Sequence, residues 1–338
     1  MSGQGRHEEH RLGSLRQGLL VLVVCLLAGL ATSRLLVRRP EPEPLRLMRP
    51  AMGTMVDVVI PAGDEGDDRA RAAAAAHAAL AEAARVDSLF SWLLPPPASM
   101  SEAARRDERR EVLQDGLRVM RLSGGAFDAR VMPLVKAWGF DADAPRVPPA
   151  DTVAALTARL AALGPPTGAD ELESRPDLLH FGAWAKGHAV DRALDAIRAH
   201  GREAALVNAG GEVRGYGKDW QVGVQHPRLP GALLATLRPG DLAVATSGDY
   251  EQYFEQDGVR YHHLLDPRTG RPARECRSVT VLAPTCAEAD ALATAVFVLG
   301  PRDGLDLVER LPDVECLVID AAGERHDSSG LARYLADR

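Results

Sequence analysis

The stretch AKGHAVDRALDAIRAHGREAALVN, residues 185–208, joins a predicted helix to the first of several closely spaced strands. Apolar side chains in the run 185–200 recur at helical spacing and form one stripe: Ala189, Ala193, Leu194 and Ile197. Gly201 follows as a helix stop, and the short apolar run 205–208 predicts a strand. A helix that leads into a strand-rich half of the chain is typical of an α+β protein.

Helices and strands are segregated along the rest of the chain. Apolar periodicity predicts further helices at Arg69–Leu89, Glu111–Leu122, Asp151–Leu163 and Ala287–Leu299. It predicts strands at Met55–Ile60, Trp220–Gln225, Leu242–Thr246, Tyr261–Leu265, Ser278–Ala283 and Cys316–Ile319. Because most strands cluster in the second half, we predict an α+β layered fold with a mixed or antiparallel sheet and packed helices.

The composition indicates a globular protein without a nucleic-acid partner. Apolar residues make up 46% and charged residues 26% of the chain, as in ordinary folded domains. The net charge of −7 disfavours nucleic-acid binding, which needs clustered lysine and arginine. Without C-x-x-C spacing, three cysteines are interpreted as small buried hydrophobic residues rather than as zinc ligands or a disulfide framework: Cys276, Cys286 and Cys316.

The N-terminal region contains an uncharged, almost wholly apolar run at 17–33. With Leu35–Val37 included, the run reaches the ~20 residues that a spanning helix needs. We interpret it as a membrane helix, either a signal anchor or a signal peptide. The chain is accordingly divided into a cytoplasmic segment, the membrane helix, a proline-rich linker and one exported domain: residues 1–16, 17–37, 38–46 and 47–338.

The stretch EADALAT, residues 288–294, contains the most informative pair of side chains. On a helix, Asp290 and Thr294 lie one turn apart on the same face, so their oxygens can converge on one point. Mg²⁺ prefers oxygen ligands and completes its shell with water or phosphate. Spacing alone leaves an alternative open, because an acidic residue in the first turn also stabilises a helix N-terminus.

Short glycine-containing motifs are candidates for nucleotide contacts. The loop GGAFD at 124–128 offers backbone N–H groups beside a carboxylate, and Lys186 lies at an expected helix start, where phosphate binds well. Ser247, in TSG at 246–248, offers hydroxyl and amide donors to a phosphate. Each motif has a structural alternative, as does NAGGE at 208–212, because glycine also stops helices and forms turns.

A pair of adjacent histidines, His262 and His263, lies on an expected strand that enters a Pro/Gly turn. Side chains of adjacent strand residues point to opposite faces, so only one of the two can face a given cleft. Imidazole suits general-base work on a hydroxyl because its pKa lies near neutrality. A purely structural role for a strand histidine is the alternative.

In their order along the chain, these motifs resemble the ApbE family of flavin transferases. The resemblance runs from about Leu47 to Ile319 and rests on the segments Met52-Gly-Thr54, Gly124-Gly-Ala-Phe-Asp128, Pro133-Leu, Trp138-Gly-Phe140, Ala185-Lys-Gly187, Asn208-Ala-Gly-Gly211, Thr246-Ser-Gly248, His263-x-x-Asp-Pro267 and Ala289-Asp-x-x-x-Thr294. It implies an Mg²⁺-dependent enzyme that transfers FMN from FAD to a threonine or serine of another protein. The product would be a phosphoester, with release of AMP.

The resemblance also implies roles for individual residues. The FAD cleft would be lined by Met52 and Trp92 at the flavin and by Ala126, Phe127, Asp128, Lys186 and Leu265 elsewhere. The backbone carbonyl of Ala183 would bind Mg²⁺ together with Asp290 and Thr294, which makes Asp290 a catalytic residue as well. His263 would help to activate the acceptor hydroxyl.

Two segments depart from the family pattern. His180 stands where the D-x-G-x-x-x-K-G run has an acid, which alters the expected adenosine-side contacts of FAD. The segment Ala98–Ala104 departs from the S-E-x-S-R-x-N pattern. These departures keep two alternatives open: an Mg²⁺-dependent FAD pyrophosphatase that uses water as the acceptor, and a membrane-tethered FAD-binding protein without turnover.

The resemblance further implies a protein partner. Family members modify membrane redox subunits at D-x-x-[ST]-G-A-[ST]-like motifs, and this chain itself contains no such motif. Together with the apolar N-terminal run, this places the expected enzyme at a bacterial inner membrane. Its catalytic domain would lie on the periplasmic side.

Overall fold

The computed structural model describes residues 42–63, 66–91, 94–141 and 145–336. The chain divides into two units, Met1–Glu43 and Pro44–Arg338, and every element below belongs to the second. The expected membrane helix and the segment before it lie outside the described residues. Within the described ranges, no helix combines the length and the apolar character needed to span a bilayer.

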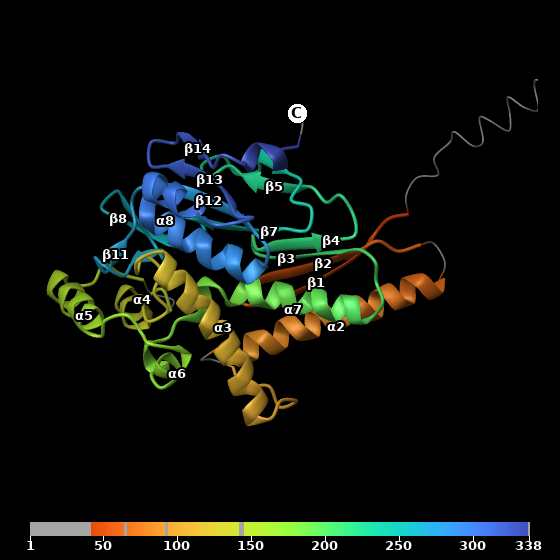
Figure 1. The fold of residues 1–338 in the computed structure, drawn as a ribbon, viewed down its shortest axis with the longest axis horizontal. Coiled ribbons are helices and arrows are strands. Elements are labelled where there is room, and N and C mark those ends of the chain that lie inside the picture. Colours follow the sequence, from red (N-terminus) through yellow and green to blue (C-terminus); the bar gives the residue numbers. More distant parts are fainter. Residues whose placement is uncertain (1–41, 64–65, 92–93, 142–144, 337–338) are drawn as a thin grey trace, which may run out of the picture. The chain divides into compact units, whose positions relative to one another are not determined.

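An eight-stranded sheet forms the centre of the second unit (Figure 1). Its order is β1–β2–β3–β4–β7–β12–β13–β14, and every neighbouring pair is antiparallel. The strands are β1 (Leu45–Ala51), β2 (Thr54–Ile60), β3 (Ala205–Ala209), β4 (Val213–Tyr216), β7 (Ala243–Gly248), β12 (Cys276–Ala283), β13 (Glu315–Asp320) and β14 (Arg325–Asp327). The predicted α+β class is confirmed, with an antiparallel main sheet.

The two faces of the sheet belong to two different hydrophobic cores, because successive side chains of a strand point to opposite sides. In β12, Val279 and Val281 face the larger core, whereas Leu282 faces the smaller one. In β13, Val318 faces the larger core and Leu317 the smaller one. Since both faces are covered, these strands read in the sequence as nearly continuous apolar runs.

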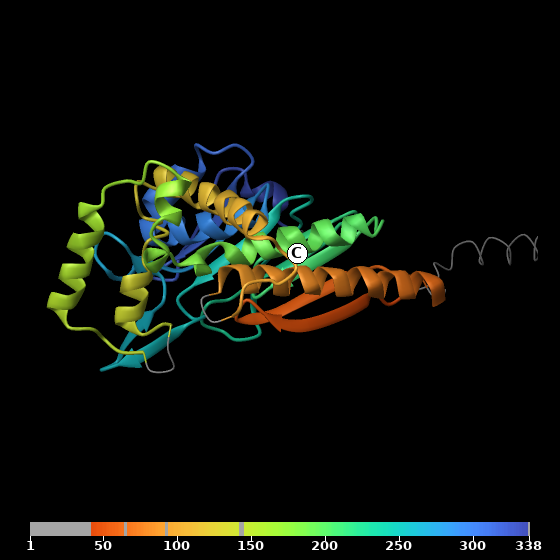
Figure 2. The ribbon, with the colours of Figure 1, turned by 90° about the horizontal axis from the view of Figure 1, so that it is seen from below.

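Three long helices cover the first face: α2 (Gly66–Phe90), α7 (Ala185–Ala199) and α8 (Cys286–Val308). Helix α2 packs on β1 and β2, α7 on β3 and β4, and α8 on β7, β12 and β13. Helices α2 and α7 lie side by side (Figure 2), and α3 (Glu102–Leu122) packs against α8. The start of α7 and the start of α8 therefore meet above the middle of the sheet.

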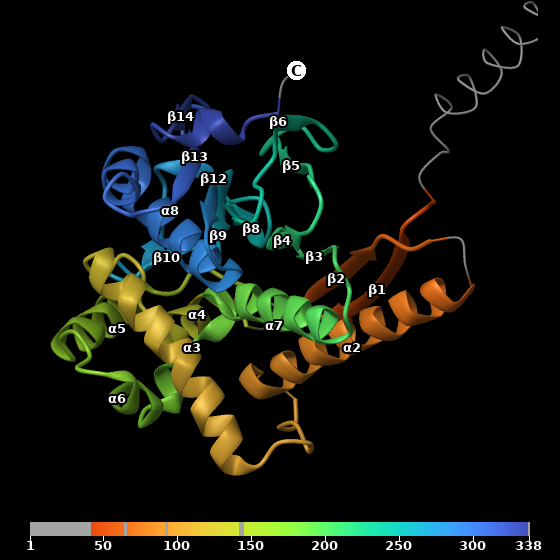
Figure 3. The same cartoon turned by 45° about the vertical axis from the view of Figure 1, so that its right-hand side comes forward.

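The second face is covered by the hairpin of β5 (Val222–Gln225) and β6 (Leu233–Leu237) and by the short helix η3 (Leu331–Tyr334) (Figure 3). A third apolar cluster joins α4 (Met132–Trp138) to α5 (Ala150–Ala162). Between α5 and α7 the chain forms α6 (Ala169–Glu173), η1 (Pro176–Leu178) and η2 (Phe181–Ala183).

The differences from the predicted elements have local causes. The helix predicted at Glu111–Leu122 begins at Glu102 because Ser101 caps it, its Oγ accepting a hydrogen bond from the Ala104 N–H at 3.2 Å. Strand β1 has no predicted counterpart, because it lies at the sheet edge and most of its side chains are exposed. Exposed edge strands need no apolar alternation, so the periodicity signal is missing.

The single strand predicted at Tyr261–Leu265 is wrong, because two short strands replace it. Strand β9 (Val259–His262) pairs with β8 (Tyr253–Gln256), and β10 (Leu265–Asp266) pairs with β11 (Arg271–Pro272). His263 follows the end of β9 directly. The two histidines are therefore not successive residues within one strand.

Helix α8 bends inside its length, directly after the predicted helix end at Leu299. Gly300 adopts a φ of 84°, which breaks the helical geometry, and a second helical part follows. Cys286, the first residue of α8, is buried and unpaired, as are Cys276 and Cys316. This confirms the interpretation of these cysteines as small buried hydrophobic residues.

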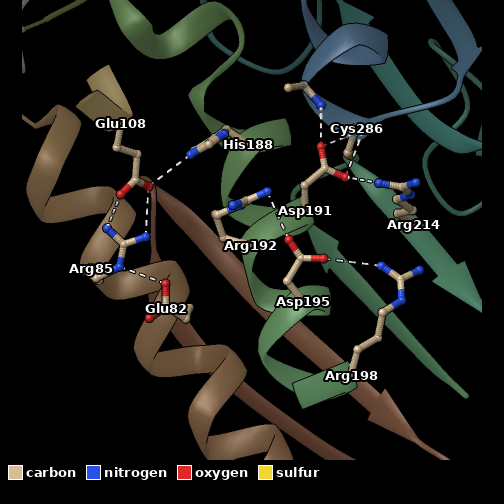
Figure 4. A network of polar contacts seen from close by, with 11 residues as sticks. Glu82, Arg85, Glu108, His188, Asp191, Arg192, Asp195, Arg198, Arg214 and Cys286 are labelled. Atoms are coloured by element: carbon tan, nitrogen blue, oxygen red, sulfur yellow. Dashed lines mark hydrogen bonds and ion pairs between the residues drawn. The ribbon is translucent and has the colours of Figure 1, made fainter. Parts of the chain in front are cut away.

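The N-terminus of α8 is held by Asp191 of α7 (Figure 4). The carboxylate of Asp191 accepts hydrogen bonds from the Cys286 N–H at 2.9 Å and the Ala287 N–H at 3.1 Å. It also pairs with Arg214 of β4. Because helix N-termini leave their first N–H groups without partners, this carboxylate satisfies them and joins α7, α8 and the sheet at one buried point.

We expect Asp191→Ala to lower the free energy of unfolding by about 3 kcal/mol, because it leaves Arg214 and two helix N–H groups without their acceptor. Asp195 is the matched control, one turn further along α7. Its side chain is 50% exposed and pairs with Arg192 and Arg198 at 3.0 and 3.4 Å. Asp195→Ala should therefore lower the free energy of unfolding by less than about 1 kcal/mol. Urea unfolding measures the stability of both variants. Equal losses of stability would contradict the role given to Asp191 in joining α7, α8 and the sheet.

Candidate active site

Three charged side chains meet where α7, α8 and the β3–β4 turn come together. Lys186, in the first turn of α7, forms an ion pair with Glu212, which directly precedes β4. Its Nζ also lies 3.7 Å from Oδ1 of Asp290, near the start of α8. Glu212 and Asp290 are 1% and 3% exposed. Two buried carboxylates thus face one ammonium group.

Negative charge is in excess in this cluster, since two carboxylates face one ammonium group. Burial raises the pKa of Asp290 far above the usual carboxyl range, although Lys186 opposes the shift. Burial by itself would lower the pKa of Lys186, but Asp290 and Glu212 outweigh it and hold that pKa above its ordinary value. Oε2 of Glu212 is buried and has no hydrogen-bond partner within the described ranges. The cluster therefore favours a further cation, which would stabilise both carboxylates.

Gly187 allows α7 and α8 to approach closely enough for this contact. A Cβ atom at Gly187 would lie 2.2 Å from the carbonyl oxygen of Cys286 and 2.7 Å from Cα of Ala287. The Gly187 N–H donates to Oδ2 of Asp290 at 3.0 Å. The missing side chain of Gly187 thus lets the N-terminal N–H groups of α7 reach a carboxylate on α8.

Two hydroxyl groups, one on α8 and one on β7, contact each other. Thr294 follows Asp290 by one helical turn, as its spacing predicts, and its Oγ1 is 3.4 Å from Oγ of Ser247 in β7. Ala183 is the last residue of η2, a segment that packs against α8. The structure therefore brings Ser247 and Thr294 together and places Ala183 in a segment that packs against α8.

His263 faces the same region as Lys186. Its Nδ1 lies 3.2 Å from the carbonyl oxygen of Gln252, so Nδ1 carries the proton and Nε2 keeps a lone pair. Loss of water around the half-buried ring lowers its pKa to about 3, although the hydrogen bond to Gln252 opposes the shift, and the positive charge of Lys186 adds to it. His263 is therefore a neutral imidazole whose Nε2 can accept a hydrogen bond from a hydroxyl.

His262 lies in a different environment. It is 5% exposed, and its Nε2 donates to the carbonyl oxygen of Ala273 at 2.7 Å. Its ring packs edge-on against Phe297 of α8, with ring centroids 5.4 Å apart. The expectation that the two histidines face opposite ways thus fits their contacts, although only His262 belongs to a strand.

Met52 occupies the turn between β1 and β2 with a φ of 56°, and Gly53 follows with a φ of 70°. A left-handed conformation is uncommon for methionine, and such strain often marks functional sites. The Met52 N–H donates to Oδ2 of Asp87 in α2 at 2.7 Å, which holds the turn against the helix. Trp92, the other predicted flavin contact, lies outside the described residues.

The GGAFD loop contributes mainly to the core. Ala126 and Phe127 are 1% and 2% exposed, and the Phe127 ring packs edge-on against Trp184. Neither side chain is therefore open to a ligand. Asp128 forms a buried pair with Arg130, with Nη2 to Oδ2 at 2.7 Å and Nε to Oδ1 at 2.9 Å.

The glycines of this loop border a cavity of about 640 Å³. Asp128 lies on the same wall, and Pro267, from the motif that begins with His263, lies on another. Leu265, two residues earlier, is buried in the apolar cluster of α4 and α5. The structure thus joins two motifs that are far apart in the sequence.

His180 lies just before η2, and its N–H donates to the carbonyl oxygen of Ala129 at 2.8 Å. Burial lowers the pKa of His180 to about 4, although the charge of Asp141 opposes the shift. The ring lies against Gly182, where an added Cβ would be 2.7 Å from its Cε1. A neutral ring therefore stands where the family pattern has an acid.

Three residues of the site were given no role of their own by the sequence: Glu212, Gly187 as a close-contact residue, and Asp87. The sequence does contain a signal for Glu212, because an acidic residue directly after Gly-Gly at the end of a strand is held near the turn. The other two depend on contacts between distant elements. No local pattern reports such contacts.

Residues 52–318 match the profile of the ApbE family. The chain belongs to the ApbE family. Among proteins similar to this ApbE-family chain, two named FAD:protein FMN transferase come from Vibrio cholerae and Treponema pallidum. The first is 37% identical over 244 residues, which cover 67% of this chain and 71% of the relative. The second is 34% identical over 261 residues, which cover 67% and 72%.

Solved ApbE structures share the fold of this ApbE-family chain. The ApbE protein of Thermotoga maritima superposes with a TM-score of 0.73 at 29% identity, covering 87% of this chain and all of that one (100%). The apo form of Pseudomonas stutzeri flavinyl transferase ApbE gives a TM-score of 0.69 at 27% identity, covering 88% and 98%. These similarities confirm the predicted ApbE-like fold.

The protonation of His263 can be tested in this ApbE-family protein by NMR. We expect its ring to titrate with a midpoint near 3, because the surrounding protein disfavours the charged form. Since an unfolded histidine has a pKa of ~6.5, the unfolded chain binds this proton first, and stability should fall as the pH drops from about 6.5 towards 3. A midpoint near 6.5 would contradict the assignment.

Proposed function

We propose that this ApbE-family protein transfers FMN from FAD to a threonine or serine hydroxyl of an acceptor protein, releasing AMP. The proposal is carried by the buried cluster of Lys186, Glu212 and Asp290 at the start of α7. A lysine, a helix N-terminus and acidic cation ligands together suit a pyrophosphate with a bound metal ion. The relatives named FAD:protein FMN transferase supply the substrate class.

Mg²⁺ fits the donor atoms of this region. Asp290 and Thr294 supply a carboxylate and a hydroxyl, and the buried Oε2 of Glu212 lacks a partner in the described part of the chain. With the backbone carbonyl of Ala183, these residues would hold the ion against the pyrophosphate. Once bound, Mg²⁺ would neutralise negative charge that builds on the phosphoryl oxygens.

The side chains of this chain would position donor and acceptor. Lys186 and the N–H groups of α7 would bind phosphate oxygens, and Met52 in its strained turn would contact the flavin. The lone pair on Nε2 of His263 is available for the proton of the acceptor hydroxyl. That hydroxyl oxygen attacks the FMN-side phosphorus, the bond to the AMP phosphate breaks, and AMP leaves.

FAD hydrolysis with water as the acceptor is a second candidate. The observation that favours it is His180, whose neutral ring replaces the family's acid and alters the contacts expected on the adenosine side. Hydrolysis would use the same cation site and the same base. It would yield free FMN instead of a modified protein.

We further propose that the segment 17–37 places the domain on the periplasmic side of a bacterial inner membrane, where a membrane redox subunit would be the acceptor. The support is the uncharged apolar run at 17–33. Fractionation of cells that express the full chain should find the protein in the membrane or the periplasm. Recovery of all of it from the cytosol would contradict this placement.

The transfer proposal predicts a stoichiometric exchange. With FAD, Mg²⁺ and a partner carrying the acceptor motif, the mass of the partner should rise by one FMN less water, and AMP should appear in equal amount. Excess EDTA should stop both. Equal release of AMP with a threonine-to-alanine acceptor, accompanied by free FMN, would establish the hydrolase instead.

Variants in the same assay assign the roles. Asp290→Asn should remove most transfer, because it deletes the charged ligand, and His263→Ala should lower the rate by roughly 10²–10⁴-fold. His262→Ala should lower the rate at saturating acceptor far less, since that ring faces Phe297. Equal losses from the two histidine variants, both still folded, would show that the histidine pair acts through structure alone.

A further inference from the structure

A second cleft, of about 460 Å³, lies beside the β8–β9 hairpin. Its wall contains four arginines and one aspartate: Arg228, Arg260, Arg274, Arg277 and Asp249. We name it the arginine cleft. It also contains His262, the residue before His263. None of the roles proposed above uses these arginines.

The aspartate does not balance the arginines. Asp249 forms a bidentate pair with Arg228, with Nη1 to Oδ1 at 2.7 Å and Nη2 to Oδ2 at 2.6 Å. Arg260 lies 3.8 Å from the same carboxylate and 3.1 Å from Glu255. Even with that outer acid counted, the cleft keeps an excess of positive charge.

Arg274 and Arg277 hold this excess charge. The Arg274 guanidinium lies 5.6 Å from the centroid of the Tyr261 ring, and the ring is neutral. Arg277 donates from Nε and Nη2 to the carbonyl oxygen of Ala321 at 3.0 and 2.6 Å. In the described part of the chain, neither forms an ion pair with a carboxylate. Both can therefore pair with acidic groups from outside.

The arginine cleft is next to the candidate active site along two segments of chain. His262 belongs to the cleft wall, and His263 directly follows it in the chain. Ser247, which contacts Thr294, precedes Asp249 of the cleft wall by two residues. A polypeptide bound in the cleft would therefore be close to the base that is proposed to receive its proton.

We propose that the arginine cleft binds the carboxylates of an acidic segment of the acceptor protein, next to the residue that receives FMN. The proposal rests on the transferase function proposed above. The chain has a net charge of −7, so a cleft with four arginines stands out as the complement of an acidic partner. The arginines are anchored at separate points, which suits several carboxylates along a polypeptide better than one small anion.

Direct binding tests the cleft independently of the reaction. The probes are a fluorescein-labelled peptide with glutamates on both sides of a threonine, and its twin with glutamines in their place. By fluorescence anisotropy, the wild type should bind the glutamate peptide about 5- to 30-fold more tightly than the glutamine peptide, and salt should reduce the difference. Equal affinities would overturn the proposal.

Arg274→Glu is the informative variant, because Arg274 lies over the Tyr261 ring and forms no ion pair with any described residue that the replacement would break. The preference for the glutamate peptide should disappear in this variant. Arg106→Glu is the matched control, since it makes the same charge change at an exposed position on α3. It should keep the preference, and loss of the preference in both variants would show a general charge effect and overturn the proposal.

Transfer assays separate this proposal from the proposed function. With a protein acceptor, Arg274→Glu should raise the acceptor KM more than the FAD KM. If the wild type transfers FMN while Arg274→Glu and Arg106→Glu behave alike, the cleft assignment fails and the transferase stands. If the wild type transfers no FMN but binds the glutamate peptide through Arg274, the transferase fails and the acidic-segment site stands.

Discussion

The arrangement of the site depends on the carboxylate of Asp191 at the N-terminus of α8. It accepts the first N–H groups of that helix and pairs with Arg214 of β4, so two helices and the sheet meet at one buried point. Lys186 lies on α7, Asp290 on α8, and Glu212 directly before β4. The same contact that joins the elements therefore determines how far apart the three charges lie.

Burial of Lys186, Glu212 and Asp290 makes the binding of a further cation at this cluster favourable. Two carboxylates removed from water are stabilised by one ammonium group, the pKa of Asp290 is strongly raised, and one oxygen of Glu212 has no partner in the described ranges. Clustering of strongly perturbed groups is typical of functional sites, because binding a ligand or a metal ion relieves the unfavourable burial. The close approach at Gly187 adds the N–H groups of α7 to the same place.

The end of β9 separates two environments. His263 faces the charged cluster as a neutral imidazole, whereas His262 packs against α8 and borders the arginine cleft. A flavin nucleotide and an acidic protein segment differ in the surfaces they need. On the proposed function, the charged cluster would bind the flavin nucleotide and the arginine cleft would bind the acidic segment. The two surfaces lie on the two sides of one short strand, and the acceptor hydroxyl would lie between them.

The sequence by itself determined the α+β class, most of the helices, and the placement of Asp290 and Thr294 one helical turn apart, because these depend on spacing within one element. It also located Lys186 at a helix start. Only the tertiary structure decided that Glu212 pairs with Lys186, and that the Gly187 N–H reaches Asp290, 103 residues away. Those contacts follow from which helix faces the two hydrophobic cores bury together, and burial depends on the whole chain rather than on any local pattern.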